Sequence, residues 1–260
     1  MTITTTTYGK LPAIQINSPD GAQAIVTLFG AHLVSWKASD GKERIFVSNT
    51  SSLDGSRAIR GGVPVIFPQF AGRGDGMRHG FARVSQWREG ASRTVGADAW
   101  CEFELDAGDL APEIAAAWPH AFALTLRVTV GAKTLQMSLD VRNTGDARFD
   151  FAAALHTYYA VEAGEQAKVQ GLEATALVVS DKIDRIYRHI GAPIALNGMR
   201  LEQAGFRDAV LWNPGPADAA GLADLGDGEW QRFVCIEPAT VDPMPLLPGE
   251  TWSARHTITA

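Results

Sequence analysis

Cysteine is scarce in this chain. Cys101 and Cys235 are the only two among 260 residues, and neither belongs to a CxxC pair. Two cysteines are too few for the disulfide framework that stabilises many small secreted domains. The composition therefore favours a reduced, cytoplasmic protein, although it leaves a single disulfide open.

Long apolar runs and an excess of positive charge are also missing. The opening residues, MTITTTTYGK, lack the basic region and apolar run of a signal peptide. No apolar stretch approaches the roughly 18 residues that suggest a membrane span. The chain holds 23 Lys plus Arg against 29 Asp plus Glu, which gives a net charge of −6. Neither a membrane nor a nucleic acid is expected as a partner.

Helical periodicity is rare, and strand periodicity takes its place. One short helix is predicted, over residues 110–118. Apolar and polar residues alternate in segments such as 122–130 and 134–141, and strands are also predicted at 229–239 and 251–260. Many short strands without alternating helices favour an all-β protein, a β-sandwich. With no linker or internal repeat, residues 1–260 are expected to form one domain.

Several motifs of catalytic and binding sites are absent. The six histidines form no HxH or HExxH pattern, so a metal site has little support. The sequence has no GxSxG nucleophile motif. It also lacks GxGxxG and GxxxxGK, so nucleotide binding is not indicated. No cofactor is expected.

Arginine is concentrated in one segment of this acidic chain. The stretch IRGGVPVIFPQFAGRGDGMRHGFAR contains a single acid, Asp75, and five basic or imidazole side chains: Arg60, Arg73, Arg78, His79 and Arg83. Such a cluster is typical of a site for a small anion. Ion pairs with acids elsewhere in the fold are an equally good interpretation of the spacing alone.

Three further side chains are candidates for chemistry. In RFDFAAALHTYYAV, read as one continuous strand, His156 follows two alanines on its face, which leaves space for a ligand beside the imidazole. Glu237 ends the apolar run RFVCIE, where a carboxylate is costly unless it is paired or functional. Asp184 lies among charged neighbours. A core histidine, a salt-bridged glutamate and a solvated aspartate are the structural alternatives.

Taken in order, the segments of the chain resemble one known family. IRGGVPVIFPQF, HGFAR, LHTYYAV, DRIY, LWNPG, CIEPA and LPGETW are similar to segments of the hexose-6-phosphate mutarotases, also called glucose-6-phosphate 1-epimerases, in the aldose 1-epimerase group. The similarity spans roughly residues 25–255. It implies a large antiparallel β-sandwich of the galactose mutarotase-like type, with a substrate cleft on one concave sheet.

The resemblance also implies roles for the candidate residues. His156 and Glu237 match the family's catalytic pair, and Asp184 matches an acid that binds sugar hydroxyls. A 6-phosphate would then be the anion of the arginine segment, with Arg60 and Arg83 on the phosphate and His79 beside them. The family commonly has Gln where this chain has Arg78, so Arg78 is a candidate for an additional anion contact.

The expected reaction is exchange of the α and β anomers of an aldohexose 6-phosphate. It requires one group that removes a proton from the anomeric hydroxyl and one that gives a proton to the ring oxygen. From their ordinary pKa values, near 4.3 for Glu and 6.5 for His, Glu237 is predicted as the base and His156 as the acid. A glycosidase or lyase on a similar sandwich and a non-catalytic sugar-binding module are the alternatives. The preferred hexose and the oligomeric state stay open.

Overall fold

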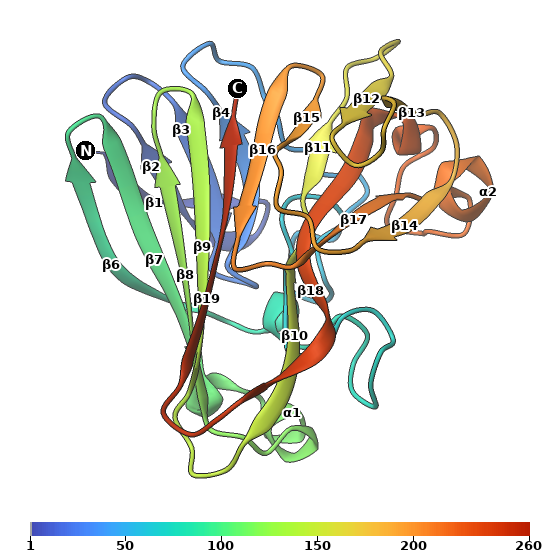
Figure 1. Ribbon diagram of the computed structural model, residues 1–260. Coiled ribbons are helices and arrows are strands. Elements are labelled where there is room, and N and C mark those ends of the chain that lie inside the picture. The colour runs from blue at the N-terminus through green and yellow to red at the C-terminus, as the bar shows by residue number, and fades with distance from the viewer. Residues whose placement is uncertain (1) are drawn as a thin grey trace.

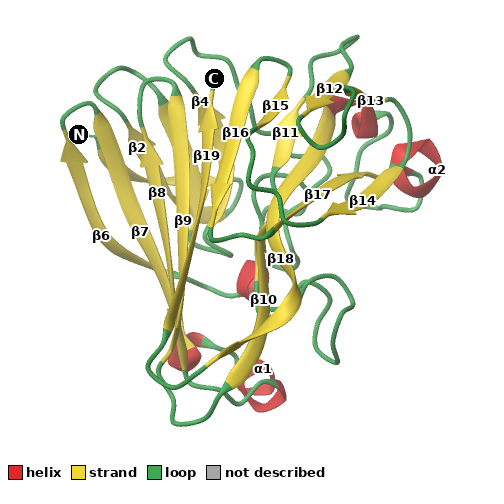
Figure 2. Ribbon diagram, viewed as in Figure 1, coloured by secondary structure: helices red, strands yellow, loops and turns green. Residues whose placement is uncertain are grey.

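A computed structural model describes residues 2–260, which fold mainly into antiparallel strands (Figures 1 and 2). A four-stranded sheet follows chain order: β1 (Ile3–Tyr8), β2 (Leu11–Asn17), β3 (Gln23–Thr27) and β4 (His32–Lys37). A nine-stranded sheet has the order β13 (Leu177–Val179), β12 (Ala167–Gln170), β15 (Ile194–Leu196), β16 (Met199–Ala204), β19 (Thr251–Thr259), β9 (Thr134–Asn143), β8 (Phe122–Val130), β7 (Asp98–Asp106) and β6 (Arg88–Val95).

The third sheet carries the strands that matter most for function. Its order is β14 (Ile183–Tyr187), β17 (Asp208–Asn213), β18 (Phe233–Leu246), β10 (Phe149–Leu155) and β5 (Val65–Ile66), and β11 (Tyr158–Ala160) also pairs with β18. The helices are short: α1 (Pro112–Ala117), α2 (Gly215–Ala219) and the 3₁₀ turns η1 (Ala82–Val84), η2 (Ala107–Asp109) and η3 (Glu229–Arg232). The predicted all-β antiparallel sandwich is confirmed, and α1 lies where the sequence predicts a helix.

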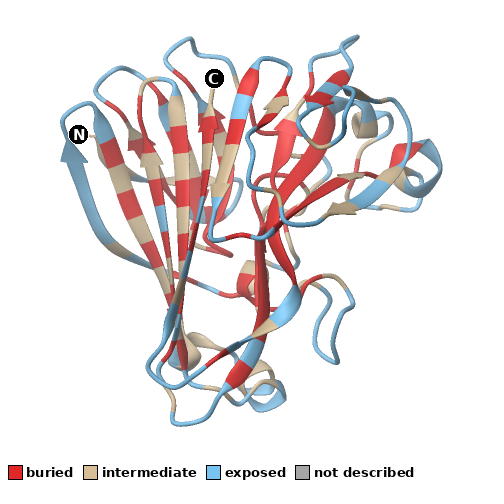
Figure 3. Cartoon of the chain, in the orientation of Figure 1, coloured by how far each residue is buried: buried red, intermediate tan, exposed pale blue. Residues whose placement is uncertain are grey.

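Alternation of side chains explains the nine-stranded sheet. In β8, Phe122, Leu124 and Leu126 are buried, whereas the Arg127 side chain between them and Val128 is exposed. Leu126 lies opposite Leu139 of β9 on one side and Phe103 of β7 on the other, so a row of apolar side chains crosses the sheet. Figure 3 shows the alternation along β7, β8 and β9 as bands of buried and partly exposed residues.

Strand β10 from Phe151 onward and strand β18 from Phe233 to Val241 are buried on both faces, whereas residues 242–245 of β18 are largely exposed (Figure 3). Phe151 and Ala153 belong to the main core, which the nine-stranded sheet also enters. Ala152 and Ala154 face the other way and pack in a smaller cluster with Val210 and others. The third sheet is therefore covered on its outer face as well, and the outer face is where the polar candidates lie.

Two predicted strands differ from the structure. The segment 148–161 is not continuous: β10 ends at Leu155, His156 and Thr157 are outside any strand, and pairing resumes at Tyr158 in β11. The strand predicted from residue 229 begins only at Phe233, because Gly228 has a φ of +73° and residues 229–232 form the 3₁₀ turn η3. Hydrophobic alternation does not report such interruptions, since they depend on turns that few residues specify.

Candidate active site

A cleft of about 660 Å³ opens on the outer face of the third sheet. Seven of the eight residues singled out in the sequence line it: Arg60, Arg78, His79, Arg83, His156, Asp184 and Glu237. The eighth, Arg73, forms an ion pair with Asp242 instead. A groove of about 790 Å³ elsewhere, lined by Lys42, Arg44 and Lys168 among others, contains none of them. Segments more than 170 residues apart along the sequence thus meet in one place, as the resemblance implied.

Strand register explains why these side chains converge. Asp184 of β14 lies opposite Trp212 of β17, and Trp212 lies opposite Cys235 of β18. On the other side, Tyr158 of β11 is also opposite Cys235. Glu237 is two residues further along β18 and therefore shares the face of Cys235. The outer face of neighbouring strands thus supplies the floor of the cleft.

His156 and Glu237 contact each other in this cleft. His156 Nε2 lies 3.3 Å from Glu237 Oε1, and both side chains are buried. Among residues 2–260, no hydrogen-bond partner is present for His156 Nδ1 or Glu237 Oε2. We call these two residues the His–Glu pair. A buried polar group without a partner is costly, so its retention at the wall of a cleft is typical of a group that serves a ligand.

Burial shifts the two pKa values in opposite directions. Loss of solvent lowers the pKa of His156 well below its ordinary value, and the nearby His79, Arg83 and Arg60 lower it further. Burial raises the pKa of Glu237 well above its ordinary value, and the charge of Asp184 adds to the effect. Both shifts favour a neutral imidazole and a protonated carboxyl, which differs from the order expected from ordinary pKa values.

Arg60 is held on two sides. Its Nε donates to Asp224 Oδ1 at 3.1 Å, and its Nη1 donates to the Tyr158 hydroxyl at 3.1 Å. A guanidinium has five N–H donors, so these bonds leave further donors for a ligand. Asp224 is 164 residues away along the chain.

Arg83 is half-buried and has fewer partners. Its Nη2 donates to the Arg78 carbonyl at 2.9 Å, whereas its buried Nε has no hydrogen-bond partner within the described part of the chain. Desolvation and the charges of Arg60 and Arg78 lower its pKa, which means that the cation lies in an unfavourable environment. An anion would relieve this cost. We call Arg60 and Arg83 the arginine pair.

His79 lies between the arginines and the His–Glu pair. Its φ of +64° is unusual for a residue with a side chain, and Gly80 follows with +70°. The Ala71 N–H donates to His79 Nδ1 at 3.3 Å, so the neutral ring carries its proton on Nε2. Burial and the neighbouring arginines lower its pKa to about 3. His79 is therefore a neutral donor, with its ring 5.5 Å from that of His156.

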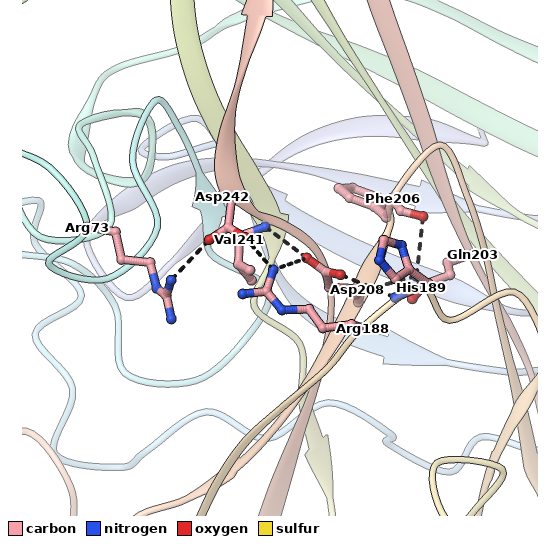
Figure 4. A network of polar contacts seen from close by, with 8 residues as sticks. All are labelled: Arg73, Arg188, His189, Gln203, Phe206, Asp208, Val241 and Asp242. Atoms are coloured by element: carbon pink, nitrogen blue, oxygen red, sulfur yellow. Dashed lines mark hydrogen bonds and ion pairs between the residues drawn. The ribbon is translucent and has the colours of Figure 1, made fainter.

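The loop that carries Arg78 and His79 is fastened at both its base and its tip. Gln69 binds the backbone of Ala71 and Gly76. Further out, Arg73 donates to Asp242 at 3.0 Å, and Asp242 also accepts from Arg188 at 2.7 Å (Figure 4). These contacts join the loop to β18 at one edge of the cleft.

Three residues of the cleft were not predicted from the sequence. Tyr158 stacks on His156, with ring centroids 5.0 Å apart and ring planes at 13°. Trp212 stands edge-on to His156 at 5.8 Å. Tyr158 shares the face of His156 in the alternating pattern and could have been identified from it. Asp224, the partner of Arg60, lies in a polar loop whose sequence gives no indication of a functional residue. Arg78 and Asp184 line the cleft as exposed side chains.

Residues 2–260 contain no group of three or more His, Cys, Asp or Glu side chains placed to hold a metal ion. In the same range, no helix has the length and apolar character needed to cross a membrane.

Known proteins resemble this chain along nearly all of its length. A protein of Cenchrus ciliaris that carries the provisional name glucose-6-phosphate 1-epimerase is 32% identical over 91% of this chain and 81% of its own. A Salmonella typhimurium crystal structure, provisionally named a mutarotase, has a TM-score of 0.85 at 28% identity over 99% of this chain and 93% of that one. Galactose 1-epimerase of Lactobacillus acidophilus shares the fold, with a TM-score of 0.70 at 16% identity over 99% and 98% of the two chains.

A family model also matches most of the chain. The family model described as aldose 1-epimerase matches residues 12–184, which contain the arginine pair, His156 and Asp184. The resemblance seen in the sequence motifs is thereby confirmed, together with the galactose mutarotase-like sandwich. This chain belongs to the aldose 1-epimerase family.

Proposed function

We propose that the protein interconverts the α and β anomers of an aldohexose 6-phosphate, with glucose 6-phosphate as the first substrate to test. The observation that carries this proposal is the composition of one cleft. It contains both a buried His–Glu contact of 3.3 Å and a half-buried arginine, Arg83, whose buried Nε has no hydrogen-bond partner among residues 2–260. The first can move protons, and the second can bind an anion. The provisional names of the relatives point to the same substrate.

Anomer exchange breaks and remakes the bond between C1 and the ring oxygen. In ring opening, Glu237 would take the proton of the anomeric hydroxyl while His156 gives a proton to the ring oxygen. The open aldehyde then turns about its C1–C2 bond and closes with the two roles exchanged. Positioned proton transfer of this kind contributes roughly 10²–10⁴-fold to rate. The Nδ1 and Oε2 atoms without partners in residues 2–260 supply further contacts for the sugar.

The remaining residues would bind the two ends of the substrate. A phosphate monoester carries about two negative charges at neutral pH and accepts paired hydrogen bonds from guanidinium groups. The arginine pair would therefore hold the 6-phosphate, with Arg78 at the rim. Asp184 would accept hydrogen bonds from sugar hydroxyls near Glu237, and His79 would donate through Nε2. No cofactor takes part in these steps.

Exchange of pure anomers provides the test. Freshly dissolved α-glucose 6-phosphate should reach equilibrium faster with the protein than without it, as followed by NMR of the anomeric proton. Free glucose should equilibrate with a lower kcat/KM, because it lacks the anion. If the protein accelerates neither sugar, the catalytic role is wrong. If kcat/KM for free glucose equals kcat/KM for glucose 6-phosphate, the assignment of the arginine pair is wrong.

A further inference from the structure

Tyr158 contacts one member of the arginine pair and one member of the His–Glu pair. Its hydroxyl accepts a hydrogen bond from Arg60 Nη1 at 3.1 Å, and its ring stacks on His156 at a centroid distance of 5.0 Å. The side chain is buried and is also packed against Phe233 at 5.0 Å. One rigid aromatic ring therefore separates the anion-binding guanidinium from the imidazole. A change in the position or charge of Arg60 can therefore reach His156 through the single side chain of Tyr158.

The charges around His156 are unevenly placed. The charged and titratable groups that face its ring are Tyr158 on β11, Glu237 on β18, His79 and Arg83 on the loop segment, and Arg60. The two arginines oppose a positive charge on His156. Glu237 is affected instead by its burial and by Asp184. Arg60 of the arginine pair thus reaches the His–Glu pair on the side of His156, through Tyr158.

We propose that an anion bound at the arginine pair activates the His–Glu pair, and that Tyr158 is the positioning residue that couples the two sites. This inference rests on the proposed function and extends it, because the phosphate becomes part of the catalytic machinery as well as an anchor. The proposal defines a substrate class. Sugars that carry an oxyanion group at the end opposite C1 should have a higher kcat, as well as a lower KM, than the same sugars without that group.

The physical step is a shift of one proton. Burial favours the proton on Glu237 and a neutral imidazole on His156. A bound dianion offsets the positive charges of Arg60 and Arg83, which removes part of the field that disfavours the imidazolium. The proton then moves from the Glu237 carboxyl to His156. The pair keeps one proton and zero net charge throughout, and it gains the carboxylate base and the imidazolium acid that ring opening needs.

The same coupling must act in reverse. If a bound anion makes protonation of His156 more favourable, protonation of His156 must strengthen anion binding by the same factor. Coupling between two sites typically amounts to roughly 5- to 150-fold. With the anion bound, His156 keeps its proton to a higher pH. The high-pH limb of kcat should therefore lie at higher pH for glucose 6-phosphate than for free glucose.

Supplying the sugar and the anion as two separate molecules tests the activation proposal on the wild-type protein alone. Free glucose is mixed with the wild-type protein and inorganic phosphite, which supplies the anion as a separate molecule. We expect phosphite to raise the turnover of glucose in a saturable manner, by roughly tenfold. The same phosphite without protein measures the buffer catalysis that must be subtracted. Phosphite should also compete with glucose 6-phosphate, which shows that it occupies the arginine pair.

A matched pair of tyrosine variants tests the coupling residue. Tyr158→Phe keeps the ring on His156 and removes the bond to Arg60. It should lower the activation by phosphite and lower kcat for glucose 6-phosphate more than it raises KM. Tyr159→Phe is the control, since that hydroxyl faces the core and bonds His256 at 2.6 Å. It should leave the activation ratio unchanged, and a thermal melt shows what either variant costs in stability.

The outcomes separate this inference from the function on which it rests. If the wild-type protein does not accelerate glucose 6-phosphate, the proposed function fails. If it does so, but phosphite only inhibits and never raises glucose turnover, the activation proposal is overturned while the function stands. If phosphite activates Tyr158→Phe as strongly as the wild type, the role of Tyr158 is wrong.

Discussion

His156 Nε2 and Glu237 Oε1 lie 3.3 Å apart at the floor of a cleft. Their pKa values move toward each other's usual range, that of His156 down and that of Glu237 up, because both groups are buried. Burial thus works against the ordinary order of the two groups, in which histidine binds a proton more tightly than glutamate, so neither group is fixed as the only proton carrier. This suits a reaction in which the acid and the base must swap roles between ring opening and ring closure.

Loss of either member should remove catalysis while the fold stays intact. We expect His156→Ala and Glu237→Gln each to lower kcat for glucose 6-phosphate by roughly 10²-fold or more, because each eliminates one proton carrier. Anomer exchange followed by NMR measures the effect, and far-UV circular dichroism checks the fold. A variant that kept more than about a tenth of the wild-type kcat would show that its residue is not a general acid or base.

The strands and the candidate residues were predictable for different reasons. The segment 122–130 shows its strand directly, since Phe122, Leu124 and Leu126 fall on one face in the sequence and in the core. His156, Glu237 and Arg60 were singled out from their sequence surroundings, and their roles were assigned through the resemblance of their motifs to a family. Alternation alone predicted one continuous strand through His156 and missed the break at His156 and Thr157.

Long-range electrostatics could not be predicted in the same way. The Asp224 carboxylate that holds Arg60 comes from a loop 164 residues away, and nothing in the intervening sequence fixes that contact. The opposed pKa shifts of the His–Glu pair could not be predicted for a related reason. Ordinary pKa values describe solvated groups, and only the packed structure shows that both side chains are out of solvent.

Buried histidines should make the protein sensitive to acid. Burial lowers the pKa of His32 and of His256 from 6.5 to about 4. Between these values the unfolded chain binds protons that the folded chain does not, so the free energy of unfolding falls as the pH falls from 6.5 toward 4. Each group can contribute as much as about 3 kcal/mol, since one pKa unit corresponds to ~1.4 kcal/mol.

Urea unfolding at a series of pH values measures this loss. His256→Gln removes one of the titrating groups, so its unfolding free energy should depend less steeply on pH than that of the wild type, even though the variant loses bonds to Tyr159 and Glu202. An equally steep dependence in the variant would mean that His256 does not titrate with a lowered pKa.

Gly62 should be irreplaceable for steric reasons that go beyond its backbone angle. Its φ is +65°, and an added Cβ would lie 2.4 Å from His32 Nε2 and 2.5 Å from the Leu33 carbonyl oxygen. Gly41 has a similar φ of +75° with nothing within 4 Å. We expect Gly41→Ala to cost about 1 kcal/mol of stability from backbone strain alone. Gly62→Ala should cost several times more and also weaken substrate binding, because it displaces the turn that follows Arg60. Equal losses in urea unfolding would exclude the steric clash.

The arginine pair should set the preference for a phosphorylated sugar. A contact between guanidinium and phosphate that is lost from a partly desolvated site typically costs a few kcal/mol. Arg83→Ala and Arg60→Ala should therefore lower kcat/KM for glucose 6-phosphate by about 10- to 100-fold, at roughly 1.4 kcal/mol per decade. The small kcat/KM for free glucose should change far less. Arg60→Ala also frees Asp224 and Tyr158, so Arg83→Ala is the cleaner variant.

Arg78 provides the internal comparison for that experiment, because it lines the same cleft as an exposed side chain. If its guanidinium contacts the phosphate, Arg78→Gln raises KM for glucose 6-phosphate and weakens the dependence of KM on salt, since one screened charge contact is gone. A silent Arg78→Gln would place the guanidinium in solvent and leave binding to Arg60 and Arg83. Measuring kcat/KM on both sugars for all three variants decides between a phosphate site and a structural cluster. If Arg60→Ala and Arg83→Ala lose as much kcat/KM on glucose as on glucose 6-phosphate, the arginines support the fold of the cleft and do not recognise the anion.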